Sequence, residues 1–353
     1  MSKKVAICNT WLRANNDILF HCDESPLTGQ LRTRILPMSS LAELGDVTQV
    51  GTVALKTDDR IIKLTTSTLN PGQITEPSIS RELVSLLKSH LQKSVRRGKI
   101  ELAVKTAMHL LDLDAINILR RLPIVMVEDV MFLEQFNATM WLMMAYPFRG
   151  LTTDDREWLL GTVDRMARVT WEDALYEEAP DDWVPDPADP CVGAIAMRRA
   201  YGGMFGDIDL LRHVAWTWRK RYQERKPGFA LNLQRLSSCT VPVKLGSVKP
   251  LLRSEFLLAA VDHHCTPITA LLPKSITNPR QMIWDCSSSI NYRMRLDFSH
   301  HDKPYWTSAQ QSAILEAQER LLENMFPDEG IIVTSQTTPD TDKSVLVKPS
   351  KSK

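Results

Sequence analysis

Apolar side chains recur every three or four residues through the stretch 79–149, and this spacing constrains the fold more than any other feature of the chain. The first series has five members at helical spacing: Leu83, Leu86, Leu87, Leu91 and Val95. Similar series follow it, up to the wholly apolar run 140–145. This spacing places one face of a helix against a core, whereas a half-buried strand alternates every second residue. Residues 79–149 are therefore predicted to form a helical bundle.

The regions on either side of the bundle differ from each other. Residues 1–70 read as β-rich, and two runs within them, 47–54 and 61–66, flank a short polar turn, which predicts a hairpin. Residues 191–330 return to helical spacing, and the polar residues 331–353 are typical of a disordered tail. The predicted fold class is mainly α with a small β-rich N-terminal part (α+β) and a helical-bundle core.

Residues 150–190 are predicted to form an acidic connector between the two helical regions. Twelve acids face three bases there, four prolines favour a loop in its second half, and three tryptophans indicate that it is held against the body. The whole chain has 43 Lys+Arg and 42 Asp+Glu, a formal net charge of +1. That balance excludes a uniformly basic nucleic-acid coat and a uniformly acidic disordered protein.

Two segments carry a strong positive charge despite this overall balance. Segment 81–105 has seven bases and two acids, and segment 212–226 has six bases and one acid, so each has a local net charge of +5. Trp216, Trp218 and Tyr222 lie among the bases of the second segment. Clustered cations bind phosphates, and aromatic rings stack on bases. For each segment alone, the favoured interpretation is the solvated face of a helix whose aromatic residues lie in the core, and both segments on one face of the fold would favour phosphate binding.

The residues predicted to contact nucleic acid come from these two segments. They are Lys93, Arg96, Arg97, Lys99, Arg219, Lys220, Arg221, Arg225 and Trp218. The turn 93–98 has the composition of a phosphate-binding turn, but its cations also suit the C-terminal end of a helix, which is the favoured interpretation. The acidic residues in 172–189 are candidates for covering this surface or for binding a basic partner.

No catalytic motif is complete, so the sequence favours a binding protein over an enzyme. Phosphate-binding loops and dinucleotide fingerprints are absent, and no cofactor is predicted. Glu128 and Asp129 could hold a divalent ion for nuclease chemistry, although salt bridges to the arginines at 120–121 are a better fit. The His and Cys clusters at 263–265 and 300–301 leave metal binding open, but adjacent histidines rarely reach one ion. No metal site is predicted.

The cysteines, the first residues and the lengths of the apolar runs indicate the cellular compartment. The six cysteines are scattered without a Cys-x-x-Cys pair, and the first residues lack the apolar core of a secretory signal. No apolar run reaches the length of about 18 residues that a membrane span requires. We therefore expect an intracellular protein with free thiols in a reducing compartment, the cytoplasm or nucleus, and no contact with membranes.

Three short motifs follow one another within the first helical region: Lys-Ser-Val-Arg-Arg-Gly at 93–98, Leu-Arg-Arg-Leu at 119–122 and Glu-Asp-Val at 128–130. The stretch 88–131 resembles the helical region after the ATPase core in the replication-associated recombination protein A (MgsA) and Werner-helicase-interacting AAA+ family. The resemblance implies a helical bundle related to clamp-loader collar domains and a setting around replication forks. The ATPase core is missing, and Met131 stands where the family has glycine. No catalytic residue is therefore carried over.

These features together predict a nucleic-acid-associated accessory or scaffold protein that binds the phosphates of DNA or RNA through two basic helices. One alternative is a structural or interaction subunit of a larger assembly, such as a viral one, because 9 Trp and 14 Met can populate interfaces. A further alternative is a metal-dependent nuclease. Protein partners or self-association fit the first two hypotheses.

Overall fold

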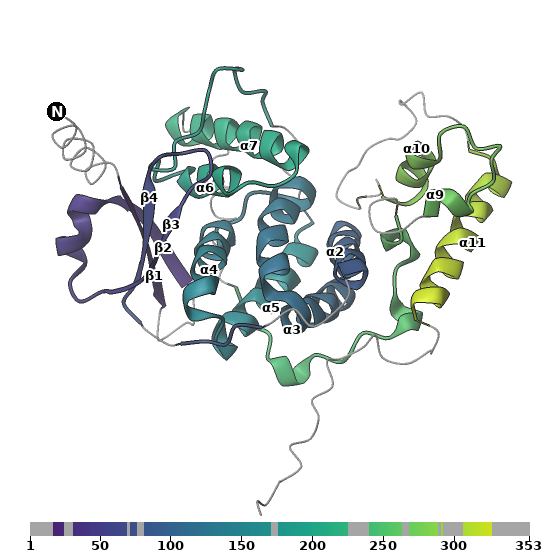
Figure 1. The fold of residues 1–353 in the computed structure, drawn as a ribbon, viewed down its shortest axis with the longest axis horizontal. Coiled ribbons are helices and arrows are strands. Elements are labelled where there is room, and N and C mark those ends of the chain that lie inside the picture. The colour runs from purple at the N-terminus through teal and green to yellow at the C-terminus, as the bar shows by residue number, and fades with distance from the viewer. Residues whose placement is uncertain are drawn as a thin grey trace, which may run out of the picture.

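The structure is a computed structural model. It describes residues 17–24, 31–68, 71–75, 81–170, 176–224, 240–262, 268–288, 291 and 306–326. Helices make up most of this part of the chain, and a small sheet lies near its N-terminal end (Figure 1). The predicted fold class, mainly α with a small β-rich N-terminal part, is confirmed.

The sheet has four strands in the order β2-β1-β4-β3. The strands are β1 (Ile18–Glu24), β2 (Leu31–Pro37), β3 (Thr48–Ala54) and β4 (Ile61–Thr66), and the 3-10 helix η1 (Met38–Leu44) follows β2. The pairs β1–β2 and β3–β4 are antiparallel, whereas β1 and β4 run parallel. The hairpin predicted from the runs 47–54 and 61–66 is therefore confirmed. The strand β1, one of the two central strands, begins with Ile18, Leu19 and Phe20, which are fully buried.

The helical body begins with α2 (Arg81–Arg96) and α3 (Ile100–Val125), which pack against each other. Gly98 lies between them with φ of +63°, and the Lys99 amide donates to the carbonyl of Ser94 at 2.8 Å. A glycine in this left-handed conformation is a common way to end a helix, because other residues meet a steric penalty there. The end of the first helix at Gly98 is thus as the sequence predicted.

Helix α3 changes direction at Asp114, where φ is −162° and ψ is 79°. The Asp114 carboxylate accepts hydrogen bonds from the backbone amide of Asn117 at 3.2 Å and from its side chain at 2.6 Å. These contacts are those of an N-cap, so a new helical segment begins there. The helix then continues through Pro123 into the π-helical turn η2 (Met126–Val130). Proline favours the first turn of a helix, so the sequence predicts that Pro123 opens a new one. This prediction is wrong, because the new segment already begins at Asp114 and Pro123 lies inside it.

The next helices complete the body: α4 (Gln135–Arg149), α5 (Thr153–Arg168), α6 (Gly193–Tyr201) and α7 (Phe205–Glu224). Helix α5 occupies the first half of the stretch 150–190, and the described residues 176–190 of its second half contain no regular element. Helix α4 packs on the sheet, and the Trp141 indole donates to the carbonyl of Phe20 at 3.0 Å. Helix α3 lies between α2, α4 and α5 (Figure 1).

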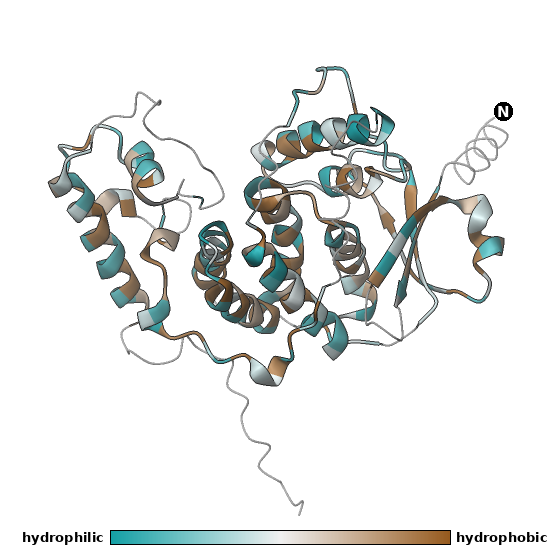
Figure 2. Ribbon diagram, turned by 180° about the vertical axis from the view of Figure 1, so that it is seen from behind, coloured by the Kyte–Doolittle hydropathy of each residue, from teal (hydrophilic) through white to brown (hydrophobic). Residues whose placement is uncertain are grey.

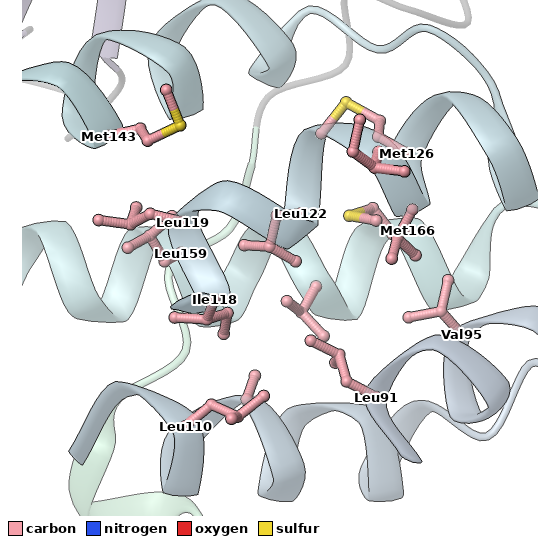
Figure 3. Packing of buried hydrophobic residues seen from close by; sticks show 14 of the residues in the cluster. Leu91, Val95, Leu110, Ile118, Leu119, Leu122, Met126, Met143, Leu159 and Met166 are labelled. Atoms are coloured by element: carbon pink, nitrogen blue, oxygen red, sulfur yellow. The ribbon is translucent and has the colours of Figure 1, made fainter. Parts of the chain in front are cut away.

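The interior of the body is built from aliphatic side chains and methionines that interlock between α2, α3, α4 and α5. Figure 3 shows Leu91, Leu122, Met143 and Leu159 among them, one from each of these helices. All four side chains are fully buried. Apolar stretches of the helices turn toward this interior, and many polar residues lie along the outside (Figure 2).

The C-terminal elements are short apart from α11, and α9, α10 and α11 lie on the far side of α2 from the sheet (Figure 1). They are η3 (Leu245–Ser247), η4 (Arg253–Glu255), η5 (Leu258–Ala260), α9 (Ile268–Leu271), α10 (Pro279–Ile283), η6 (Trp284–Ser288) and α11 (Ser308–Met325). The sequence predicts a helix over 255–264. This prediction is wrong for the described residues 255–262, which form turns packed on α2 and α11. The sequence also predicts that the last helix begins at Thr307, and this is confirmed, since the Thr307 hydroxyl accepts from the Gln310 amide.

Candidate functional site

The α2 cations predicted to meet phosphate are mostly turned inward. The Lys93 ammonium lies 2.6 Å from the Asp262 carboxylate, and their side chains are only 6% and 1% exposed. The Arg96 Nε lies 2.5 Å from the Asp129 carboxylate, and this pair is equally buried. Arg97 is half-buried, and Lys99 is exposed in the turn. Lys93 and Arg96 therefore bind carboxylates of the same chain.

The three motifs that carry the family resemblance meet in one buried network. The Gln92 amide donates to Glu128 at 3.0 Å and to Asp129 at 2.8 Å, and Arg121 donates to the Gln92 oxygen at 2.5 Å. Arg96 lies 3.4 Å from Glu128 and so contacts both acids. Burial, and then the neighbouring charge of Asp129, raises the pKa of Glu128 above its ordinary value. The network joins α2, the end of α3 and η2.

The second basic segment lies on the surface in α7. Arg219 is 3.4 Å from Asp189 with 41% of its side chain exposed, and Lys220 forms an ion pair with Glu177. The Arg221 guanidinium lies 4.9 Å from the centre of the Trp218 ring. Arg225 falls outside the described residues. The described cations of this segment are thus more accessible than Lys93 and Arg96.

The aromatic residues of α7 divide between the core and the surface. Trp218, which was predicted to contact nucleic acid, is fully buried between Phe132 and Tyr222. Trp216 is half-buried, and its ring lies 5.2 Å from that of Trp183 in an edge-to-face arrangement. Sequence reasoning did not assign these two rings to the site. The available signal was the position of Trp183 in a proline-rich acidic stretch.

The residues that follow Tyr176 run along α7 and bond to it. The Glu177 amide donates to the Thr217 hydroxyl at 2.8 Å, and the Ala179 amide donates to His213 Nδ1 at 2.9 Å. Lys220 lies over Trp216, with 5.9 Å between the ammonium and the ring centre. We call the surface formed by Trp183, Trp216, Arg219 and Lys220 the α7 face. Acidic side chains of the connector are paired with both of its cations.

Metal-ligating residues do not gather in the part of the chain that the structure describes. No group of three or more His, Cys, Asp or Glu side chains there could hold an ion. Glu128 and Asp129 contact Gln92 and Arg96 instead. The clusters at 263–265 and 300–301 lie outside the described residues.

The described chain is thus a mainly helical protein with one inward-facing and one surface-lying set of cations. Among its described helices, none combines the length and the apolar character needed to cross a bilayer. No family model matches the sequence, and no curated protein or solved structure is significantly similar to it.

Proposed function

We propose that this protein is a nucleic-acid-associated accessory protein that binds single strands of DNA or RNA through the α7 face. The observation that carries the proposal is the placement of Trp216 and Trp183 beside the exposed side chains of Arg219 and Lys220. Proteins that bind single strands combine cations for the backbone with aromatic rings on which bases stack. The α7 face has both cations and aromatic rings, and its residues Trp216, Arg219 and Lys220 lie within two turns of α7.

The acids now paired with the α7 face do not prevent such binding. Exposed ion pairs like Lys220–Glu177 contribute only about 0–1 kcal/mol, because water and salt screen them. A phosphate can therefore replace Glu177 or Asp189 at small cost. Buried pairs such as Lys93–Asp262 differ, since removing one partner costs about 3–5 kcal/mol. Exchange with a polyanion is accordingly favoured at α7 and disfavoured at α2.

The setting we propose is around replication forks. It rests on the resemblance of residues 88–131 to the helical region of the MgsA and Werner-helicase-interacting family. The contacts among Gln92, Arg96, Arg121 and Asp129 give the resembling motifs a common structural purpose, because they hold two helices and a turn together. In this proposal α2 and α3 supply the scaffold and α7 supplies the binding surface.

The test is a set of equilibrium binding titrations by fluorescence anisotropy at low salt. Labelled single-stranded DNA, single-stranded RNA and duplex DNA are compared on the full chain. The variant Arg219→Gln/Lys220→Gln should weaken single-strand binding by about tenfold or more. The matched control Arg32→Gln/Arg280→Gln removes two exposed cations elsewhere and should bind like the wild type. Absence of binding to all three probes, or equal weakening by both variants, contradicts the proposal.

A second candidate function is that of a self-associating subunit in a larger assembly. The observation that favours it is the adjacent pair Met204 and Phe205 at the start of α7, which are 59% and 87% exposed. Large apolar side chains so exposed are typical of interfaces when they adjoin one another. Sedimentation velocity over a range of concentrations tests it: a wild-type oligomer that Phe205→Ser converts to monomer supports it, and a strict monomer contradicts it.

A further inference from the structure

Two side-chain bridges cross the seam between α2 and α3 one helical turn apart. The Lys88 ammonium donates to the Asn117 side-chain oxygen at 3.2 Å, and Arg121 donates to the Gln92 side-chain oxygen at 2.5 Å. Lys88 and Gln92 are four residues apart on α2, as Asn117 and Arg121 are on α3, so each pair shares a helix face. Lys88 and Arg121 are therefore neighbours, one turn or about 5.4 Å apart along the seam.

A cavity of about 380 Å³ lies beside this seam. Its lining includes Lys88 and Arg121, the start of α7 at Met204 and Asp207, and Trp284 of η6. Four cations and three carboxylates line it, a balance of one positive charge. Residues of α3, η2, α7 and η6 thus surround the polar side chains of α2 that line the cavity. A cavity with a few convergent polar groups is the usual form of a small-molecule site.

Arg121 has hydrogen-bonding capacity left over in this cavity. Among the described residues it makes one hydrogen bond, to Gln92. Its guanidinium also forms ion pairs with Glu128 at 3.7 Å and Asp207 at 3.6 Å, but it donates a hydrogen bond to neither. A guanidinium carries five N–H donors in a planar fork that matches phosphate oxygens. Arg121 can therefore bind an anionic group without giving up the Gln92 bridge.

Trp284 supplies a flat apolar surface at the next level of the cavity. Its side chain is 40% exposed, and the Arg96 guanidinium lies 5.7 Å from the centre of its ring. Arg96 follows Gln92 by one turn of α2, and Gln92 accepts from Arg121, so Trp284 and Arg121 contact neighbouring turns of α2. The same cavity thus offers Arg121 to an anion and Trp284 to an aromatic ring.

We propose that this cavity binds a single nucleotide unit, with its phosphate on Arg121 and Lys88 and its base stacked on Trp284. The carboxylate of Asp207 is placed to accept a hydrogen bond from a sugar hydroxyl. The unit is either a free mononucleotide or the 5′-phosphorylated end of a strand, because both present the same groups. Binding of a strand end rests on the proposed function, whereas binding of a free mononucleotide does not.

Isothermal titration calorimetry on the full chain tests the site with AMP, adenosine and inorganic phosphate. AMP should bind at least about fivefold more tightly than inorganic phosphate, because stacking contributes that much to base binding. It should also bind more tightly than adenosine, because adenosine lacks the phosphate that Arg121 and Lys88 contact. Arg121→Gln, Lys88→Gln and Trp284→Ala should each weaken AMP binding by at least about fivefold. The matched controls Arg280→Gln and Leu315→Ala, both on exposed sites of the C-terminal elements, should leave it unchanged.

The two sources are separated with oligonucleotides that carry or lack a 5′-phosphate. A strand-end site predicts tighter binding of the phosphorylated strand, and Lys88→Gln should reduce that preference because Lys88 contacts the phosphate. Free-nucleotide binding predicts AMP affinity without any such preference. The inference is overturned if neither AMP binding nor the 5′-phosphate preference occurs, or if Trp284→Ala and Lys88→Gln change neither. If Arg219→Gln/Lys220→Gln loses strand binding but keeps AMP binding, the cavity and the α7 face are separate sites. If the wild type binds AMP but no strand, the proposed function is contradicted and the nucleotide site is supported.

Discussion

Replacing Lys93 with methionine separates a structural role of α2 from a phosphate-binding one. The Lys93 ammonium contacts Asp262 at 2.6 Å and Ser89 at 3.1 Å, and both charged side chains are at least nine-tenths buried. Methionine keeps much of the packing and removes the charge, so the Asp262 carboxylate remains buried without its cation. The expected loss is about 3–5 kcal/mol of unfolding free energy. That is a large share of the roughly 5–15 kcal/mol that stabilises a typical domain.

Urea unfolding followed by circular dichroism measures this loss. The double variant Lys93→Met/Asp262→Leu should recover most of the stability, because an apolar pair of similar volume often replaces a buried ion pair without loss. Lys99→Met changes an exposed cation of the same segment and should stay within about 0.5 kcal/mol of the wild type. The reasoning is refuted if Lys93→Met unfolds like the wild type but no longer binds single strands.

Three further predictions concern the helical body, and all are read by urea unfolding. Thr152→Ala should lower the free energy of unfolding by about 1 kcal/mol, because the Thr152 hydroxyl and the Asp155 carboxylate form the capping box of α5. A decrease below about 0.3 kcal/mol counts against that cap. Gly150→Ala should lower the free energy of unfolding by more than about 1 kcal/mol, since Gly150 has φ of +68° and a Cβ would come 2.4 Å from the backbone of Gln73. An unchanged midpoint of urea unfolding contradicts this. Burial lowers the pKa of His90 to about 3, below the value of about 6.5 in the unfolded chain. The resulting stabilisation is complete above about pH 6.5 and is lost as the pH falls toward 3, with a slope of up to about 1.4 kcal/mol per pH unit. His90→Gln should flatten that slope, and an equal slope in both proteins rules out this origin.

Local signals in the sequence predicted the helical elements well. Periodic leucines marked α2, and Gly98 marked its end because the backbone there needs a positive φ. A threonine followed three residues later by glutamine marked the start of α11 at Thr307. These features depend on residues within one or two helical turns. Where an apolar stretch could form either a helix or turns, as at the described residues 255–262, local spacing predicted the wrong structure.

The positive charge of segment 81–105 did not predict which of its cations are available to a phosphate, because the acids that neutralise them are far away in the sequence. Asp129 is 33 residues from Arg96, and Asp262 is 169 residues from Lys93. A count over adjacent residues includes neither acid, although both are within hydrogen-bond distance in the fold. The net charge of a segment therefore does not give the charge of the surface around it.

The aromatic residues of α7 show a related limit. Trp216 and Trp218 are two residues apart, so they point to different sides of the helix. Which side is buried depends on Phe132, which packs against Trp218 from another part of the chain. Composition indicated that aromatic rings lie near the cations of α7. It did not indicate that Trp216, rather than Trp218, is the ring at the surface.

The salt dependence of single-strand binding tests the central claim most directly. Each phosphate neutralised on a single strand contributes about −0.7 to the slope of log K against log salt concentration. Arg219 and Lys220 together predict a slope of about −1.4 for the wild type, measured by anisotropy from about 50 to 200 mM salt. Arg219→Gln/Lys220→Gln should bring the slope close to zero. A slope near zero in the wild type, or the same slope in both proteins, contradicts binding through the α7 face.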